Sequence, residues 1–144
     1  MKVKLKITGN KELLKKIRTF GGEAETRIEG ITQISAQEIA LKAIQNVPVN
    51  YGTIKQSISS QKEKPLLYTI NVNELPIGAY VEFGTGARVK VAPEWKDLAW
   101  QFYKNGKGYL PPSPYLYPAW KSGGVQYEKD LKDLLQYLTN KYNT

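Results

Sequence analysis

The segment AYVEFGTGA at residues 79–87 sets one carboxylate beside a glycine-rich break in the chain. Glu82 belongs to a residue type that serves as a general acid or base, and the glycine pattern of residues 84–86 is of the kind found in loops that bind phosphate. A catalytic carboxylate ordinarily works with a second acid, a base or a metal ion. The nearest acids in the sequence are Glu74 and Glu94, so a catalytic pair would have to be completed by the fold.

The composition of the 144-residue chain removes most of this chemistry. It contains no histidine and no cysteine, which excludes Ser-His-Asp and Cys-His catalysis, disulfides and thiolate metal sites. Residues 84–86 fit neither GxxxxGKS/T nor GxGxxG, the patterns of nucleotide-binding loops. We therefore expect no cofactor, and we expect Glu82 to accept hydrogen bonds from backbone N–H groups, such as those of residues 84–86. Polysaccharide cleavage through Glu82 is an alternative that requires a second acid nearby.

The net charge of +8 is unevenly distributed along the chain. Residues 1–18 carry a net charge of +6, whereas residues 19–87 carry −2. A stripe formed by Lys2, Lys4 and Lys6 would suit weak contact with DNA, so a basic nucleic-acid-binding module is an alternative function. Basic residues also occur on solvated faces and protein interfaces. No apolar run approaches the ~20 residues needed to cross a bilayer, so no membrane association is predicted.

Hydrophobic periodicity predicts the elements of the first half. Apolar residues alternate with lysines over residues 3–7, which is typical of a strand at the edge of a sheet. The spacing over residues 11–20 is helical. A longer apolar stripe over residues 24–47 predicts an amphipathic helix of roughly twenty residues or more. Pro48 ends this helix, because the residue before a proline avoids the helical region.

The second half is predicted to complete the sheet and then to leave it. Residues 54–83 supply the remaining strands, including an antiparallel hairpin. An inserted excursion follows at about residues 88–109, in which Pro93 suits the first position of a helix. The prolines of LPPSPYLYP, residues 110–118, favour an extended path. A last helix is expected over about residues 125–142, after a pair of glycines.

Together these elements predict an α+β fold within a single domain over residues 1–144. A small, mainly antiparallel sheet packs against a long helix of the N-terminal half and against a C-terminal helix. The excursion is rich in aromatic residues, which are enriched at the centres of protein interfaces. We expect these residues at a subunit interface: Trp95, Trp100, Phe102 and Tyr103.

Four motifs, taken in order, resemble the bacteriophage neck or tail-completion (head–tail joining) family typified by gene product 10 of a lambdoid siphophage. They are ITGNKELLKKIRTF, VPVNYGTIKQSI, AYVEFGTG and LPPSPYLYPAW. Their order and spacing also fit, so the resemblance covers nearly the whole chain. The chain departs from the family pattern at Tyr51, Ile54 and Trp120, where the pattern has threonine, leucine and a smaller aliphatic residue.

The resemblance implies a structural protein of the virion neck with no enzymatic activity. Such a protein forms a homo-oligomeric ring, which we expect to be a hexamer, and joins the head connector to the tail around the DNA channel. The implied partners are further copies of the chain, a head connector or stopper protein, a tail terminator or tail tube protein, and DNA in weak contact. The expected location is the virion, after the host cytoplasm. Structural roles carry over to Pro48, Gly52, Tyr80, Glu82, Phe83, Gly84, Thr85, Gly86, Pro114 and Pro118.

Overall fold

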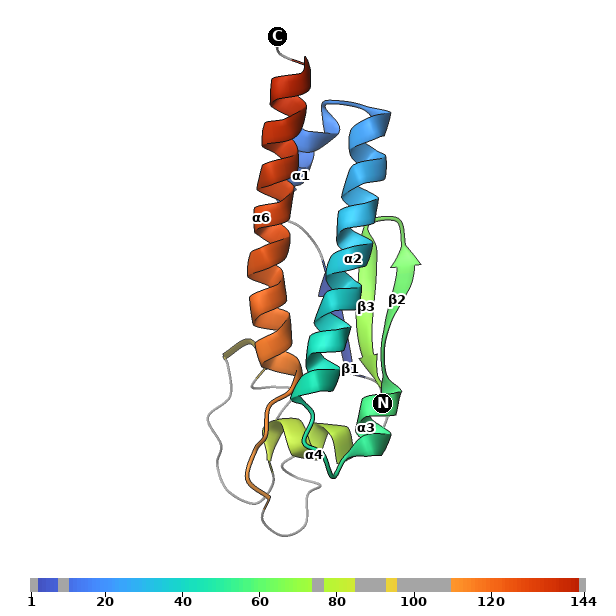
Figure 1. Cartoon of the computed structure of the whole chain (residues 1–144), viewed down its shortest axis with the longest axis vertical. Coiled ribbons are helices and arrows are strands. Elements are labelled where there is room, and N and C mark those ends of the chain that lie inside the picture. Colours follow the sequence, from blue (N-terminus) through green and yellow to red (C-terminus); the bar gives the residue numbers. More distant parts are fainter. Residues whose placement is uncertain (1–2, 8–10, 74–76, 85–92, 96–109, 143–144) are drawn as a thin grey trace.

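The computed structural model describes residues 3–7, 11–73, 77–84, 93–95 and 110–142 (Figure 1). Of residues 3–7 it describes the backbone. The elements, in chain order, are β1 (Val3–Ile7), α1 (Lys11–Arg18), α2 (Gly22–Asn46), α3 (Gly52–Ser57), β2 (Ile58–Lys64), β3 (Leu67–Val72), α4 (Ile77–Phe83), the 3-10 helix η1 (Pro93–Trp95) and α6 (Leu116–Tyr142).

The three strands form one antiparallel sheet in the order β1-β3-β2. Ile70 at the centre of β3 pairs with Leu5 on one side and with Ser60 on the other. The prediction that residues 3–7 form an edge strand is therefore confirmed, and so is the hairpin between β2 and β3. Tyr68, Ile70 and Val72 alternate along β3 and are buried, which gives α2 an apolar surface to cover.

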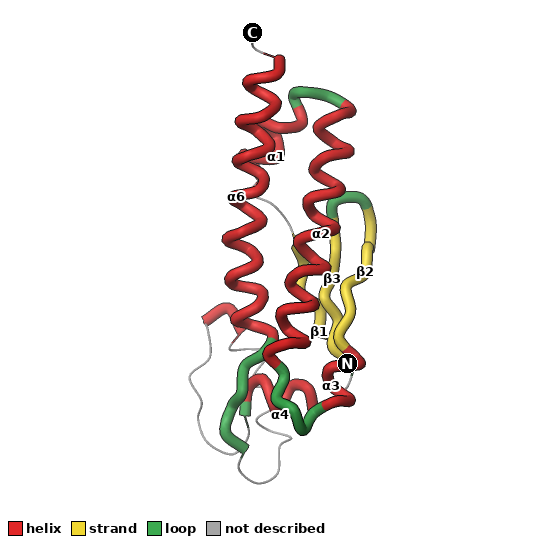
Figure 2. Tube along the Cα trace, viewed as in Figure 1, coloured by secondary structure: helices red, strands yellow, loops and turns green. Residues whose placement is uncertain are grey.

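Helix α2 is the central element of the fold. The sheet lies on one side of it and α6 on the other, with α1 packed between the ends of the two helices (Figures 1 and 2). Its C-terminal end follows the predicted signal, because Val47, preceding Pro48, is extended. At the other end Gly21 adopts a φ of 88° just before the helix begins. The α+β fold predicted from the sequence is confirmed. None of the helices in the described part of the chain combines the length and apolar composition needed to cross a membrane.

Polar contacts of Thr32 and Glu29 help to hold α2 to α6 and to the sheet. The Thr32 hydroxyl donates to the Ile28 carbonyl at 2.8 Å, so its partner Tyr127 on α6, also at 2.8 Å, must be the donor of the bond between the two hydroxyls. On the sheet side, Glu29 accepts from the Tyr68 hydroxyl and from the Leu66 backbone N–H, each at 2.8 Å. Burial and the adjacent Glu29 carboxylate raise the pKa of Tyr68 to about 12. Glu29 thereby fixes the hairpin turn, where Leu66 adopts a positive φ of 63°.

Two segments predicted as strand are helical. Residues 52–57 form α3, which buries Ile54 completely and delays the strand until Ile58. Residues 77–83 form α4 instead of continuing the sheet. Tyr80, Val81 and Phe83 are aromatic or β-branched residues that favour a strand, but packing on several sides overrides that local preference. Gly84 ends α4 with a φ of 78°, and its N–H donates to the Tyr80 carbonyl at 2.7 Å.

Candidate functional site

The Glu82 carboxylate joins α4 to the start of α6. Its Oε2 accepts hydrogen bonds from the backbone N–H groups of Tyr115 at 2.7 Å and Leu116 at 2.9 Å. Its Oε1 accepts from the N–H of Tyr117 at 2.9 Å. The side chain is 5% exposed, so these bonds lie away from solvent. The prediction that residues 84–86 supply the donors is wrong for Gly84, whose N–H donates to Tyr80, and the carboxylate accepts from backbone N–H groups more than thirty positions away. Residues 85 and 86 lie outside the described part of the chain.

These three bonds explain why α6 begins at Leu116 and not at about residue 125 as predicted. The first N–H groups of a helix have no partner within the helix and must be satisfied from outside. Glu82 accepts the N–H groups of residues 115–117, and the next residue, Pro118, has none to satisfy. A negative charge at this end is also favourable to the helix dipole. A proline in the first turn is thus compatible with the helix, although the sequence pattern favours an extended path.

Further contacts fasten the two segments into one unit, which we call the clamp: residues 77–84 together with residues 110–118. The Ser113 N–H donates to the Val81 carbonyl at 2.7 Å, and the Tyr115 hydroxyl donates to the Gly78 carbonyl at 2.8 Å. Asn46, the last residue of α2, donates to the Tyr115 carbonyl at 3.2 Å. The clamp is therefore fixed both internally and to the central helix.

Gly84 is required by geometry at the edge of the clamp. It combines a positive φ with a very close approach to the returning chain. A Cβ placed there would lie 2.9 Å from the Leu110 carbonyl oxygen and 3.0 Å from the Pro112 nitrogen. Both of those atoms belong to the backbone, so they cannot move aside cheaply. Only glycine fits the position.

The electrostatics of the clamp indicate an anchoring role for Glu82. Burial raises the pKa of the carboxyl above its ordinary value, and the three backbone hydrogen bonds oppose that rise. Burial also raises the pKa of Tyr115, whose hydroxyl already donates to a carbonyl. Within the described part of the chain, the carboxylate accepts hydrogen bonds from backbone N–H groups. In the described ranges no group of three or more acidic residues is placed to hold a metal ion.

A family comparison adds to this geometry. A family model described as "Bacteriophage HK97-gp10, putative tail-component" matches residues 11–84, just over half of the chain. The chain belongs to the HK97-gp10-like family. The matched stretch begins with α1 and ends at Gly84, so it contains Glu82 and the α4 half of the clamp. No curated protein sequence and no solved structure matches the chain.

The family assignment confirms the resemblance inferred from the motifs, and it identifies the protein as related to phage tail components. The other half of the clamp, residues 110–118, lies beyond the matched stretch. The structure nevertheless brings it against the AYVEFG segment. Two of the four motifs that carry the resemblance are therefore in direct contact, through Glu82.

The aromatic residue Trp95 packs onto this joint. Its ring lies 5.8 Å from that of Phe83 and 5.1 Å from that of Tyr117, both in edge-to-face orientation, and 6.2 Å from that of Trp120. It is 5% exposed. The ring of Trp95 is thus covered by aromatic side chains of its own chain, and a subunit interface at this residue stays a prediction. Trp100, Phe102 and Tyr103 lie outside the described residues.

The other residues singled out from the sequence do not form one site. Pro48 accepts the Tyr51 N–H at 3.0 Å in the turn after α2, and Gly52 is the first residue of α3. Tyr80 packs partly buried against the core, and Pro114 is exposed. Thr85, Gly86 and Lys2 lie outside the described residues, as do the side chains of Lys4 and Lys6 on β1.

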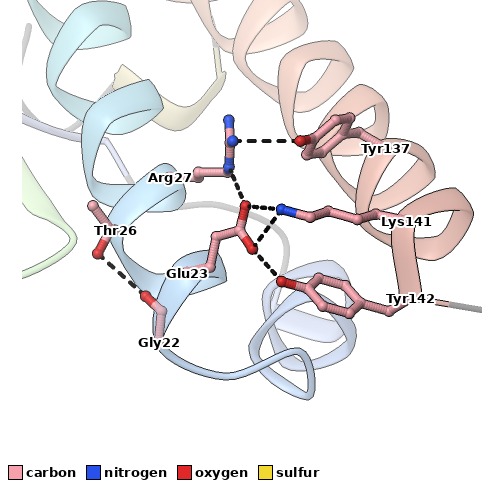
Figure 3. Close-up of polar contacts among 7 residues, drawn as sticks. All are labelled: Gly22, Glu23, Thr26, Arg27, Tyr137, Lys141 and Tyr142. Carbon is pink, nitrogen blue, oxygen red and sulfur yellow. Dashed lines mark hydrogen bonds and ion pairs between the residues drawn. The ribbon is translucent and has the colours of Figure 1, made fainter.

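Sequence reasoning missed a polar cluster at the opposite end of the helices (Figure 3). Glu23, in the first turn of α2, accepts from Lys141 Nζ at 2.9 and 3.1 Å, from the Tyr142 hydroxyl, and from Arg27 Nε at 3.2 Å. Arg27 also stacks over the ring of Tyr137, 4.8 Å from its centroid. The cluster fastens the last turn of α6 to the first turn of α2, and no local pattern connects residues so far apart in sequence.

This cluster predicts a loss of stability in acid. The hydrogen bonds from Lys141 and Tyr142 lower the pKa of Glu23 to about 2. Because this pKa lies below the ordinary value of 4.5, the stabilisation is complete above about pH 4.5 and is lost as the pH falls towards 2. We expect Glu23→Gln to lower Tm at pH 7 and to unfold with a shallower pH dependence below pH 4.5. Thermal unfolding followed by circular dichroism between pH 2.5 and 7 measures both effects.

Glu128→Gln is the matched control for this experiment. Glu128 forms an exposed ion pair with Lys132 one turn along the same helix, at 3.5 Å, and pairs of that kind contribute little. If Tm fell equally steeply with decreasing pH in the wild type and in Glu23→Gln, the assigned role of the cluster would be contradicted.

Proposed function

We propose that this chain is a structural protein of the phage neck that forms a homo-oligomeric ring and joins the head connector to the tail around the DNA channel. The clamp is the observation that carries this proposal. Its single buried carboxylate is occupied by three backbone N–H groups, so Glu82 supports the fold and is not placed to react with a substrate. Membership in a family of phage tail components supports the same conclusion.

The proposal includes the partners of the ring. Six copies would surround the channel, with a head connector or stopper protein on one side and a tail terminator or tail tube protein on the other. Ring contacts are heterologous, so one surface of each copy must fit a different surface of the next. DNA would meet the basic residues Lys2, Lys4 and Lys6 only weakly, because tight binding to phosphates would hinder passage through the channel.

Light scattering after size-exclusion chromatography, combined with negative-stain imaging, tests the proposal. We expect the purified protein, or the protein mixed with its head connector or tail partner, to form closed rings of uniform diameter. A strict monomer that binds neither partner would overturn the proposal. Tight binding of duplex DNA at physiological salt by such a monomer would favour the nucleic-acid-binding alternative instead.

A further inference from the structure

Helix α2 carries apolar residues on more sides than a single chain covers. Between Ile28 and Asn46 it contains three charged residues, Glu29, Glu38 and Lys42. Glu29 is engaged by Lys62 of the hairpin at 2.8 Å. Its exposed residues are mainly polar, so a large apolar side chain exposed among them is available for contact with another surface.

Two sides of α2 are covered within the chain, and a third is not. The α6 side is closed by contacts such as the approach of Gly123 to Ile39, and the sheet side by Glu29 and the hairpin. The remaining side carries Ile34, 56% exposed, and Leu41, 58% exposed. They are seven residues apart, which places them on one line two turns apart. We call this line the outer ridge.

The outer ridge is bordered by a shallow groove on each side. The groove towards α6 has a volume of about 190 Å³ and is lined in part by Glu38, Lys42 and Gln126. The groove towards the hairpin has a volume of about 360 Å³ and is lined in part by Gln33 and Gln37. A ridge between two grooves is the shape that packs against side chains of another surface.

The end of the molecule formed by α3 and α4 (Figure 2) carries two further exposed apolar residues. Val49, in the turn between α2 and α3, is 88% exposed, and Ile77, the first residue of α4, is 44% exposed. We call these two residues the end patch. The exposed tyrosines 137 and 142 differ from both surfaces, because they are engaged by Arg27 and Glu23.

We propose that the outer ridge of one copy packs against the end patch of the next copy; this inference rests on the proposed ring. A head-to-tail contact needs two different surfaces that fit each other, and the described part of the chain exposes large apolar residues at both of these places. Charge also favours a second copy at this place. Copies with a net charge of +8 repel each other, but the charges beside the ridge, Glu38 and Lys42, cancel. An uncharged apolar ridge offers nothing to the phosphates of DNA.

Single lysine substitutions test each surface. We expect Leu41→Lys and Val49→Lys to weaken self-association at least tenfold by light scattering, because a lysine placed in an apolar contact is desolvated without a partner. Val125→Lys is the matched control, since Val125 is 69% exposed on α6 and belongs to neither surface. It should assemble as the wild type does. All three sites are exposed, so circular dichroism should show unchanged folding.

Mixing the two variants tests the pairing itself. Leu41→Lys keeps an intact end patch and Val49→Lys keeps an intact ridge, so an equimolar mixture should form a dimer that cannot grow. Assembly of either variant alone to the wild-type size would overturn the inference while leaving the ring intact. A wild-type protein that stays monomeric, alone and with its partners, would instead overturn the proposed function and this inference with it.

Discussion

Replacing Gly123 with alanine should lower the free energy of unfolding by about 1–3 kcal/mol, the usual cost of overpacking a core, although alanine is the better helix former. A Cβ at Gly123 would lie 2.1 Å from Cγ1 and 2.6 Å from Cδ1 of Ile39. Ile39 is 1% exposed and lies in the middle of α2. Its branched side chain has essentially one χ1 conformation in a helix, so it cannot swing away. The two long helices would have to separate.

Gly124→Ala provides the matched control for this substitution. It makes the same chemical change one residue further along α6, where a Cβ would meet nothing within 4 Å. We expect it to stabilise the protein by up to about 1 kcal/mol, because alanine is favoured over glycine inside a helix. Urea denaturation of both variants measures the two effects. If Gly123→Ala were stabilised as much as Gly124→Ala, the close crossing of α2 and α6 would be disproved.

Glu82→Gln should destabilise the protein by about 1–3 kcal/mol, the cost of leaving a buried N–H group without an acceptor. Glutamine keeps one carbonyl oxygen but turns an NH2 group towards backbone donors that need an acceptor. In one orientation of the amide, this NH2 group would face the backbone N–H of Tyr117. In the other orientation it would face the backbone N–H groups of Tyr115 and Leu116. Glu82→Ala should cost more, because it leaves all three donors unsatisfied and opens a cavity.

Hydrogen exchange identifies where this loss occurs. The amides of residues 115–117 should exchange faster in Glu82→Gln, whereas those in the middle of α6 should change little. Glu38→Gln, which alters an exposed carboxylate of α2, serves as the control and should leave both sets unchanged. Unaltered protection of residues 115–117 in Glu82→Gln would show that another group supports the start of α6.

Elements with strong local periodicity could be predicted from the sequence, and elements formed by distant contacts could not. The alternation over residues 3–7 and the apolar stripe of α2 carry their own signal, because apolar residues recur there at the period of a strand and of a helix. The start of α6 carries none, since its N-terminus is satisfied by a carboxylate 33 residues earlier in the chain. The glycine pair in α6 indicates a break, yet Gly123 is required there by Ile39 of another helix.

The sequence predicts the role of Glu82 as a hydrogen-bond acceptor, but not which backbone groups donate to it. The absence of histidine and of a nucleotide motif makes a backbone acceptor the expected role of Glu82, and the structure shows backbone donors. The identity of these donors depends on how residues 110–118 pack against α4. No local sequence pattern indicates this long-range contact. Trp95 shows the same limit, because an aromatic residue in an excursion can pack inward or outward with equal local propensity.

The close approach of Gly84 to Leu110 has a consequence for how the chain can change. The segment between them starts and finishes at neighbouring points that the clamp holds in place. Closing a longer loop between fixed ends costs only about 0.6 kcal/mol for each doubling of its length. Insertions between residues 84 and 110 that preserve the aromatic contacts of Trp95 should therefore leave the helices and sheet unaffected, so this stretch can lengthen independently of the scaffold that supports it.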